Sequence, residues 1–230
     1  MAIGASGALG RHGVRTRVKV CCIETPEAAA LAIRCGADAL GLVGPMPSGT
    51  GIIDLATAAR IAGSVPPPVA TFLLSSATAP DELLAQCRQV APTAVQIVDQ
   101  VDPAAYALLR RELPALRLVQ VVHVTSDDMV AEALAVATLV DALLLDSGSP
   151  DAPVRLLGGT GRVHDWSISR RIADESPVPV FLAGGLTPAN VAEAIAAVRP
   201  FAVDLCTGLR TDGALDEAKL VAFMRAVATA

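Results

Sequence analysis

Hydrophobic residues recur along the chain in two alternating patterns. Short runs rich in β-branched and aliphatic residues, such as VKVCCI at residues 18–23, are typical of buried strands. Longer stretches rich in Ala and Leu have the spacing of helices. The first of these begins with Thr25, Pro26 and Glu27, which supply an N-cap residue, a proline at the first helical position and an acid. The pattern therefore predicts strands that alternate with helices.

Eight strand–helix units follow from this alternation. The predicted strands are 18–23, 39–43, 69–74, 94–98, 118–124, 141–145, 178–182 and 202–205. Eight such units in 230 residues favour a single-domain α/β fold, the (β/α)8 or TIM barrel. We expect residues 17–230 to form this barrel and residues 1–16, which are rich in Gly and Ala, to form a flexible N-terminal extension. A doubly wound sheet is the alternative, but no G-x-G-x-x-G sequence follows the first strand.

Composition restricts the classes of partner. The formal net charge of −5 and the lack of a basic run argue against nucleic acid as the main partner. No apolar stretch approaches the roughly 20 residues that span a bilayer, and residues 1–16 lack the apolar core of a signal peptide. We therefore expect no membrane partner and a cytoplasmic location.

The five cysteines and three histidines do not form a recognisable metal or disulfide pattern. The cysteines include no C-x-x-C pair and no disulfide-like spacing, and the histidines lack the spacing of metal ligands. We expect no metal site, and most of the cysteines to be small buried hydrophobic residues.

Candidate chemistry lies where the predicted strands end, because TIM barrels place their active sites at the carboxyl ends of the strands. Lys19 and Cys21 share one face of the first strand, and Cys22 shares the other face with Val18 and Val20. Cys21 is thus expected to point into the barrel, where Lys19 would lower the thiol pKa from about 8.5. A buried structural cysteine is the alternative interpretation of Cys21.

Three further strand ends carry polar or glycine-rich sequence. Asp146 ends the sixth strand, where partial burial would raise its pKa and suit a general acid, although a loop-capping role fits equally. Gly158, Gly159, Thr160 and Gly161 form a loop whose amides could approach an anion. Two more glycine-containing turns, at residues 183–185 and 206–208, follow the seventh and eighth strands, where barrels commonly bind phosphate.

Taken in order, these segments resemble phosphoribosylanthranilate isomerase, the aldose-to-ketose isomerase of tryptophan biosynthesis, from Val18 to near the end of the chain. The resemblance is carried by Lys19-Val20-Cys21, by LLLDSGSP and GGTGRVHDW, and by LAGGLTPANVAEAIAAVRPFAVDLCTGL. It implies that Cys21 is the general base, Asp146 the general acid, and Asp204 a carboxylate that contacts the sugar or amine. It implies a phosphate site at Gly159, Gly161, Gly184, Gly185, Thr207 and Gly208, to which we add Thr160 of the same loop.

The implied reaction is an Amadori rearrangement of a small phosphorylated sugar, with no cofactor and no metal. Opening of the furanose ring gives a Schiff base, and removal of the C2′ proton then leads to a ketone. We add Lys19 and Arg210 to the expected substrate-binding residues. The sequence leaves the choice between a monomer and a homodimer open.

The chain departs from the family pattern at five places. Residues 47–52 lack the arginine that meets the anthranilate carboxylate, and Gln96-Ile97-Val98-Asp99 stands where the family has Gln-Leu-His-Gly. Cys22 replaces a glycine, Glu24 a threonine and Arg210 an acid. Arg210 is a candidate to compensate for the missing arginine. These departures keep two alternatives open: a divergent paralogue that acts on a different phosphoribosyl adduct, and a non-catalytic phosphate-binding barrel.

Overall fold

The computed structural model describes residues 15–147 and 165–230, in which strands alternate with helices. The barrel strands are β1 (Arg17–Val20), β2 (Ala39–Val43), β3 (Ala70–Ser75), β4 (Ala94–Ile97), β5 (Arg117–His123), β6 (Ala142–Asp146), β7 (Val180–Leu182) and β8 (Ala202–Leu205). The α-helices are α1 (Pro26–Arg34), α2 (Leu55–Ser64), α3 (Pro80–Val90), α4 (Pro103–Glu112), α5 (Met129–Ala137), α6 (Trp166–Glu175), α7 (Val191–Val198) and α8 (Glu217–Ala228).

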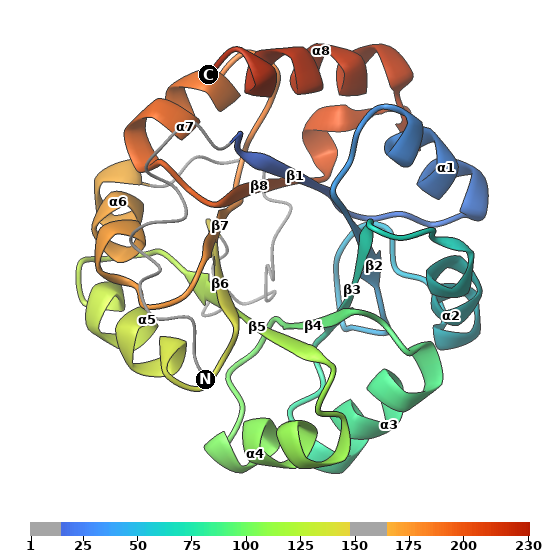
Figure 1. Cartoon of the computed structure of the whole chain (residues 1–230), viewed down its shortest axis with the longest axis vertical. Helices are drawn as coiled ribbons and strands as arrows, with labels where there is room; N and C mark the ends of the chain where they lie inside the picture. The colour runs from blue at the N-terminus through green and yellow to red at the C-terminus, as the bar shows by residue number, and fades with distance from the viewer. Residues whose placement is uncertain (1–14, 148–164) are drawn as a thin grey trace.

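The eight strands form one closed parallel barrel in sequence order, with the helices in a ring outside it (Figure 1). Closure is made by β1 and β8, where Val18 pairs with Val203 and Val20 with Leu205. An open doubly wound sheet would leave these two strands apart. The predicted TIM barrel is therefore confirmed, and the alternative of an open sheet is wrong.

The buried residues form two layers, as expected for a barrel whose strands are covered on both faces. The larger apolar cluster lies between strands and helices and includes Val18, Val20 and Leu205. The smaller one fills the barrel interior and includes Phe72 and Phe181, whose ring centroids are 5.7 Å apart. Because side chains alternate along each strand, one set of residues from every strand is directed toward the barrel axis.

The first strand ends earlier than the sequence predicts. Residues 18–23 were expected to be a strand, but β1 stops at Val20, and Cys22 adopts a positive φ of 61°. Alternation along the strand therefore fails at Cys22, which packs with the barrel-interior cluster. The expectation that Cys22 faces the helices with Val18 and Val20 is wrong, because the chain turns before that residue.

The N-terminus of α1 forms as predicted. Thr25 is the N-cap residue, its hydroxyl accepts a hydrogen bond from the amide of Ala28 at 3.1 Å, and Pro26 follows at the first helical position. This cap satisfies one of the amides that a helix start leaves unpaired. It fixes the path of the chain directly after Cys21 and Cys22.

Two features at the ends of the barrel domain complete the fold. A short 3₁₀ turn, η2 (Thr207–Leu209), and an antiparallel pair, β9 (Arg210–Thr211) with β10 (Ala214–Leu215), lie between β8 and α8 and were not predicted. Arg15, in the expected N-terminal extension, donates from Nη1 to Asp38 Oδ2 at 2.8 Å.

Across the described residues, no helix combines the length and the apolar character that crossing a membrane requires.

Candidate active site

A cavity opens at the carboxyl end of the barrel and collects most of the predicted site residues that lie in the described part of the chain. Its lining includes Cys21 after β1, Asp146 at the end of β6 and Asp204 of β8. Gly184, Gly185 and Thr207 line the same cavity from the loops after β7 and β8. The remaining candidates of the glycine-rich loop, Gly159, Thr160 and Gly161, lie outside the residues that the structure describes.

Lys19 and Asp204 form an ion pair in the barrel interior. Lys19 Nζ lies 2.8 Å from Asp204 Oδ2, and the two side chains are 0% and 7% exposed. Burial opposes the charge of the ammonium group, but the negative charge of Asp204 and the thiol of Cys21 outweigh it, so the pKa of Lys19 is raised. The other carboxylate oxygen of Asp204, Oδ1, is buried without a hydrogen-bond partner among the described residues. It is an acceptor available to a hydrogen-bond donor that enters the cavity.

The thiol of Cys21 packs directly against this ion pair. Gly41 on β2 makes room for it, because a Cβ at Gly41 would lie 2.6 Å from Cys21 Sγ and 3.1 Å from Lys19 Nζ. Burial raises the pKa of Cys21 to about 11; the cation of Lys19 lowers it and the anion of Asp204 raises it further. Lys19 lowers the thiol pKa as expected, but the expected net lowering is wrong, because desolvation is the larger effect and Asp204 partly cancels the cation.

Asp146 has the electrostatics of a general acid. It is the last residue of β6 and is buried, and its Oδ1 accepts a hydrogen bond from the Ser147 amide at 2.7 Å. Burial raises its pKa, while the Ser147 amide and the charge of His123 lower it in part. A raised pKa keeps the carboxyl group protonated at higher pH than an ordinary aspartate, as the sequence led us to expect.

Gln96 is a site residue that the sequence reasoning did not select. It lies on β4 and is 4% exposed. It lines the cavity from the side of the barrel opposite β1 and β8, the strands that carry Lys19 and Asp204. Its Oε1 has no hydrogen-bond partner in the described part of the chain. A buried amide oxygen without a donor costs free energy, about 1–3 kcal/mol, that a substrate donor would recover. The signal was present, since a glutamine interrupts an apolar strand.

The loop after β7 has the backbone geometry of an anion site. Gly184 and Gly185 adopt φ values of +88° and +64°, which a residue with a side chain rarely takes. The side chain of Asn190 ties this loop to the start of α7: Oδ1 accepts from the Thr187 amide at 2.8 Å, and Nδ2 donates to the Gly185 carbonyl at 3.0 Å. The loop is therefore held in place before any ligand arrives.

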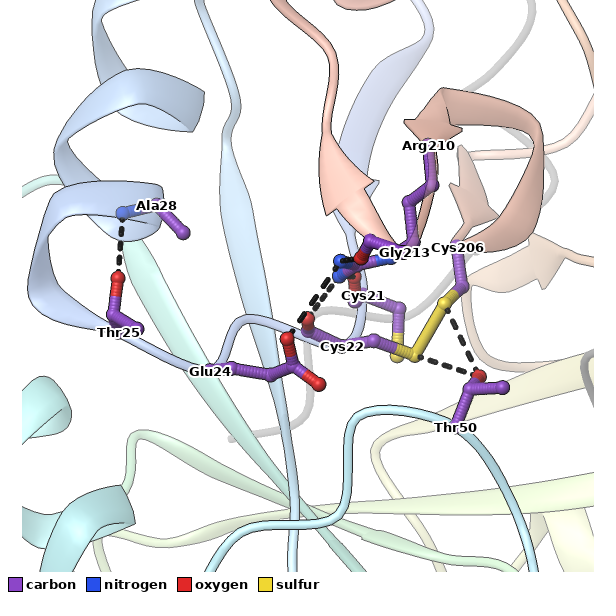
Figure 2. Close-up of polar contacts among 9 residues, drawn as sticks. All are labelled: Cys21, Cys22, Glu24, Thr25, Ala28, Thr50, Cys206, Arg210 and Gly213. Carbon is purple, nitrogen blue, oxygen red and sulfur yellow. Dashed lines mark hydrogen bonds and ion pairs between the residues drawn. A yellow bond between two sulfur atoms is a disulfide. The ribbon is translucent and has the colours of Figure 1, made fainter.

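Cys22 and Cys206 form a disulfide at the rim of the cavity, with their Cα atoms 5.9 Å apart (Figure 2). The sequence shows no disulfide-like spacing, and no disulfide was predicted. The structure corrects this, because residues 184 positions apart meet only once β8 closes against β1. Cys21, Cys35 and Cys87 are free thiols.

Arg210 does not occupy the position expected of a substrate ligand. Its guanidinium group reaches the Cys22 carbonyl oxygen and donates to Gly213 O at 2.8 Å, and Glu24 Oε2 lies 3.9 Å away (Figure 2). The side chain is 11% exposed and is not among the described residues that line the cavity. Arg210 therefore braces the loop after β1, and its contacts do not support the compensating role in carboxylate binding that the sequence suggested.

Opposite substitutions in the ion pair will shift the Cys21 thiol in opposite directions. We expect Lys19→Met to raise the pKa of Cys21 and Asp204→Asn to lower it, because the cation and the anion act on the thiol with opposite signs. The rate of Cys21 alkylation by iodoacetamide, followed by peptide mass spectrometry at mildly alkaline pH, reports the thiolate fraction. That rate should fall in the first variant and rise in the second.

Stability provides the control for this comparison. Each single variant leaves one buried charge without its partner, which costs about 3–5 kcal/mol, so both should unfold at lower urea concentration than the wild type. If both variants alkylate faster, loosened packing rather than charge controls the thiol, and the electrostatic assignment is refuted.

Comparison with known proteins identifies the family. The family model described as N-(5′-phosphoribosyl)anthranilate (PRA) isomerase matches residues 18–226. The isomerase of Halobacterium salinarum is 41% identical over 219 residues, covering 93% of this chain and 97% of the relative. That of Methanocella arvoryzae is 36% identical over 206 residues, covering 90% and 94%.

Solved structures agree with the sequence relatives. The phosphoribosyl anthranilate isomerase of Thermotoga maritima superposes with a TM-score of 0.79 at 30% identity, covering 94% of this chain and all of that one. The enzyme of Thermococcus kodakaraensis gives 0.76 at 31% identity, with 94% and 100% covered. The matches span the barrel and the strand ends that carry Cys21 and Asp146. This chain belongs to the N-(5′-phosphoribosyl)anthranilate isomerase family.

Proposed function

We propose that this chain isomerises N-(5′-phosphoribosyl)anthranilate, in an Amadori rearrangement, with Asp146 as general acid and Cys21 as general base. One observation carries the proposal: the thiol, the buried carboxyl group and the glycine loops after β7 and β8 line the same cavity. A related solved isomerase, 27% identical, is in complex with reduced 1-(o-carboxyphenylamino)-1-deoxyribulose 5-phosphate. That ligand has the skeleton of the product proposed here.

The reaction begins with proton transfer from Asp146 to the ring oxygen of the ribose. The C1–O bond breaks as the amine lone pair forms a protonated Schiff base, and Asp146 becomes a carboxylate. A raised pKa of Asp146 suits this step because it keeps the proton available. The Schiff base is the electron sink, so the proposed steps need no cofactor.

Removal of the C2′ proton by the thiolate of Cys21 completes the isomerisation. The electron pair of the C–H bond forms the enolamine, which takes up a proton at C1′ and loses the proton of its C2′ hydroxyl group, and so becomes the ketone. In the free protein the pKa of about 11 keeps Cys21 mostly as the thiol. The positive charge of the Schiff base favours the thiolate beside it. Lys19, held by Asp204, adds a second positive charge next to the sulfur.

Substrate hydroxyl and amine groups would be bound by the two buried acceptors. Asp204 Oδ1 and Gln96 Oε1 both lack partners among the described residues, and both residues line the cavity. Donors from the ribose or the anthranilate nitrogen would satisfy them. The phosphate would bind at Gly184, Gly185 and Thr207, with residues 159–161, which lie outside the described residues, as further candidates.

The direct test is turnover of freshly generated N-(5′-phosphoribosyl)anthranilate by the purified protein, followed by the loss of the substrate's fluorescence. Turnover supports the proposal. Binding of phosphate esters without turnover would instead favour a paralogue with another substrate or a non-catalytic barrel. The relatives are named for the same isomerase, so they give no support to those two alternatives.

The phosphate loop after β8 can be tested separately at Gly208. A Cβ at Gly208 would lie 2.4 Å from the carbonyl oxygen of Leu186, so Gly208→Ala must displace the loop after β7 or that after β8. We expect KM to rise roughly tenfold or more, the effect of misplacing a binding group by about 1 Å, with a smaller change in kcat. Gly63→Ala is the matched control, because a Cβ there meets no atom within 4 Å.

Inorganic phosphate as a competitive inhibitor gives the second measurement for Gly208. Its inhibition constant should rise together with KM in Gly208→Ala and stay unchanged in Gly63→Ala. A normal inhibition constant in Gly208→Ala would place the phosphate elsewhere.

The assembly and cellular location complete the proposal. We propose a monomer or a homodimer, since one related structure from Thermotoga maritima, 26% identical, is that of mutually generated monomers of a dimeric isomerase. We propose a cytoplasmic location, in keeping with a biosynthetic reaction on a phosphorylated sugar. Sedimentation of the purified protein and cell fractionation test these two points.

A further inference from the structure

Four residues connect the loop after β1 to the segment after β8, and we call them the rim clamp: Cys22, Glu24, Cys206 and Arg210 (Figure 2). The disulfide joins Cys22 to Cys206. Arg210 binds the Cys22 carbonyl oxygen and lies within an ion-pair distance, 3.9 Å, of Glu24. The clamp thus holds one residue, Cys22, through both its side chain and its backbone.

Cys22 has a backbone conformation that needs such support. Its φ of 61° lies in the left-handed region, which glycine enters freely and other residues enter at a cost. Glycine is also the residue that the family pattern has at this position. Cys22, Glu24 and Arg210 are three of the departures noted in the sequence, and the structure brings all three into contact.

The loop after β2 also packs against Cys22. Thr50 Oγ1 lies 3.7 Å from Cys22 Sγ and 3.6 Å from Cys206 Sγ (Figure 2). A Cβ at Gly51 would lie 2.5 Å from Cys22 Cβ, so this loop is in close contact with Cys22. A change in the conformation of Cys22 would therefore disturb three loops at the cavity rim.

The clamp is also next to the reacting groups. Cys22 follows Cys21, and Cys206 precedes Thr207, so the disulfide connects the proposed general base to the proposed phosphate loop. Both sulfur-bearing residues line the cavity. The hydrogen bond from the Cys21 amide to Leu205 O, at 2.9 Å, is a further link between the two segments.

We infer that the Cys22–Cys206 disulfide and Arg210 are positioning groups for the thiol of Cys21, so that isomerisation depends on the redox state of this cysteine pair. The inference rests on the role proposed for Cys21. Reduced, Cys22 keeps a conformation favoured by glycine without a covalent link to hold it, and the direction in which Cys21 leaves β1 becomes less defined. Oxidised, the covalent link removes that freedom.

The redox step is an exchange with a second thiol pair. A dithiol reductant gives two electrons and two protons to the Cys22–Cys206 bond, which becomes two thiols as the reductant becomes a disulfide. A small-molecule disulfide reverses the step and is itself reduced to two thiols. In a reducing compartment such disulfides are usually transient and regulatory, so the proposed cytoplasmic setting agrees with a switch.

A purely structural disulfide makes a different prediction. Linking residues 184 positions apart would stabilise the folded state by restricting the unfolded chain. Its loss would lower the unfolding midpoint but leave kcat unchanged at temperatures far below that midpoint. The distinguishing quantity is therefore kcat in fully folded protein.

The test compares the oxidised and reduced wild type with Cys206→Ala and with the double variant Cys22→Gly/Cys206→Ala. Reduction of the wild type and Cys206→Ala should each lower kcat about tenfold or more, as expected when a reacting group is misplaced by roughly 1 Å, with a smaller effect on KM. The double variant should recover most of this loss, because glycine takes the left-handed conformation freely. The reductant should not affect it, although it still contains Cys21.

Arg210→Met with the disulfide intact tests the other half of the clamp, and its kcat should fall while Arg210→Lys retains part of the activity. Equal kcat in the oxidised and reduced wild type, or a double variant no better than Cys206→Ala, overturns the inference. So does an increase in kcat on reduction.

Alkylation of Cys21 by iodoacetamide is measured in parallel because it does not require turnover. The rate should differ between oxidised wild type and Cys206→Ala, and return toward the wild-type value in the double variant. If no preparation turns over the substrate, the proposed function fails, while the alkylation rates still decide whether the clamp positions Cys21. Equal rates in all three proteins would refute that positioning.

Discussion

Cys21→Ala will reduce kcat for isomerisation by a factor of about 10²–10⁴, the contribution typical of a positioned general base. Alanine removes the sulfur next to Lys19 that would accept the C2′ proton, while the binding groups on β8 and in the phosphate loops stay in place. KM should therefore change much less than kcat. Steady-state fluorescence kinetics with freshly generated substrate measure both constants.

Cys87→Ala is the matched control for this variant. Cys87 is also a buried free thiol, but it lies on α3 and is not among the cavity-lining residues of the described chain. We expect wild-type kinetics from Cys87→Ala. If Cys21→Ala lowers kcat by less than about tenfold, the loss is smaller than a general base typically contributes. Another residue would then have to remove the proton.

The pH dependence of the wild type checks the protonation state of Cys21. The base acts as the thiolate, and its pKa in the free protein is raised to about 11. The thiolate fraction therefore increases with pH, about tenfold for each unit below that pKa. We therefore expect kcat/KM to rise with pH in proportion to the thiolate fraction, but only at pH values where the acid, Asp146, is still protonated.

Asp146→Asn will produce a loss of similar size, about 10²–10⁴-fold in kcat. Asparagine keeps the shape of the side chain and still accepts a hydrogen bond from the Ser147 amide, but it has no proton to give to the ring oxygen. Ring opening then depends on water. The loss should be seen in kcat, measured with the same fluorescence assay.

A change in the pH profile separates an acid from a merely structural carboxyl group. Asp146 acts in its protonated form, which is lost as pH rises through its raised pKa, and this loss offsets the growing thiolate fraction of Cys21, so the rise of wild-type kcat/KM should level off. In Asp146→Asn, kcat/KM should go on rising with pH instead of levelling off. If the variant levels off at the same pH as the wild type, with a lower kcat, Asp146 is not the acid.

Asp141→Asn is the control at the other end of the strand that carries Asp146. Asp141 lies just before β6, at the opposite end of the barrel, where its carboxylate binds Arg110 at 2.7 Å and accepts from the Leu118 amide at 2.7 Å. Residues at that end of a TIM barrel contribute to stability rather than to catalysis. We expect Asp141→Asn to unfold at lower denaturant concentration and to keep its kcat.

The sequence determined the barrel because its signals are local and repeated. The alternation of β-branched runs with Ala- and Leu-rich stretches predicted eight units, and Thr25 with Pro26 marked the first helix start correctly. The position of Cys21 and Asp146 at strand ends followed from the same alternation. Each of these inferences needs only residues that are close together in the chain.

Tertiary structure alone decided the electrostatics and the covalent links of the site. Asp204 reaches Lys19 from a position 185 residues away, and burial by the closed barrel raises the pKa of Cys21 that the lysine was expected to lower. Cys22 meets Cys206, and Arg210 meets the Cys22 carbonyl, only because β8 pairs with β1. Desolvation and long-range partners depend on how the whole chain closes, so no local pattern contains them.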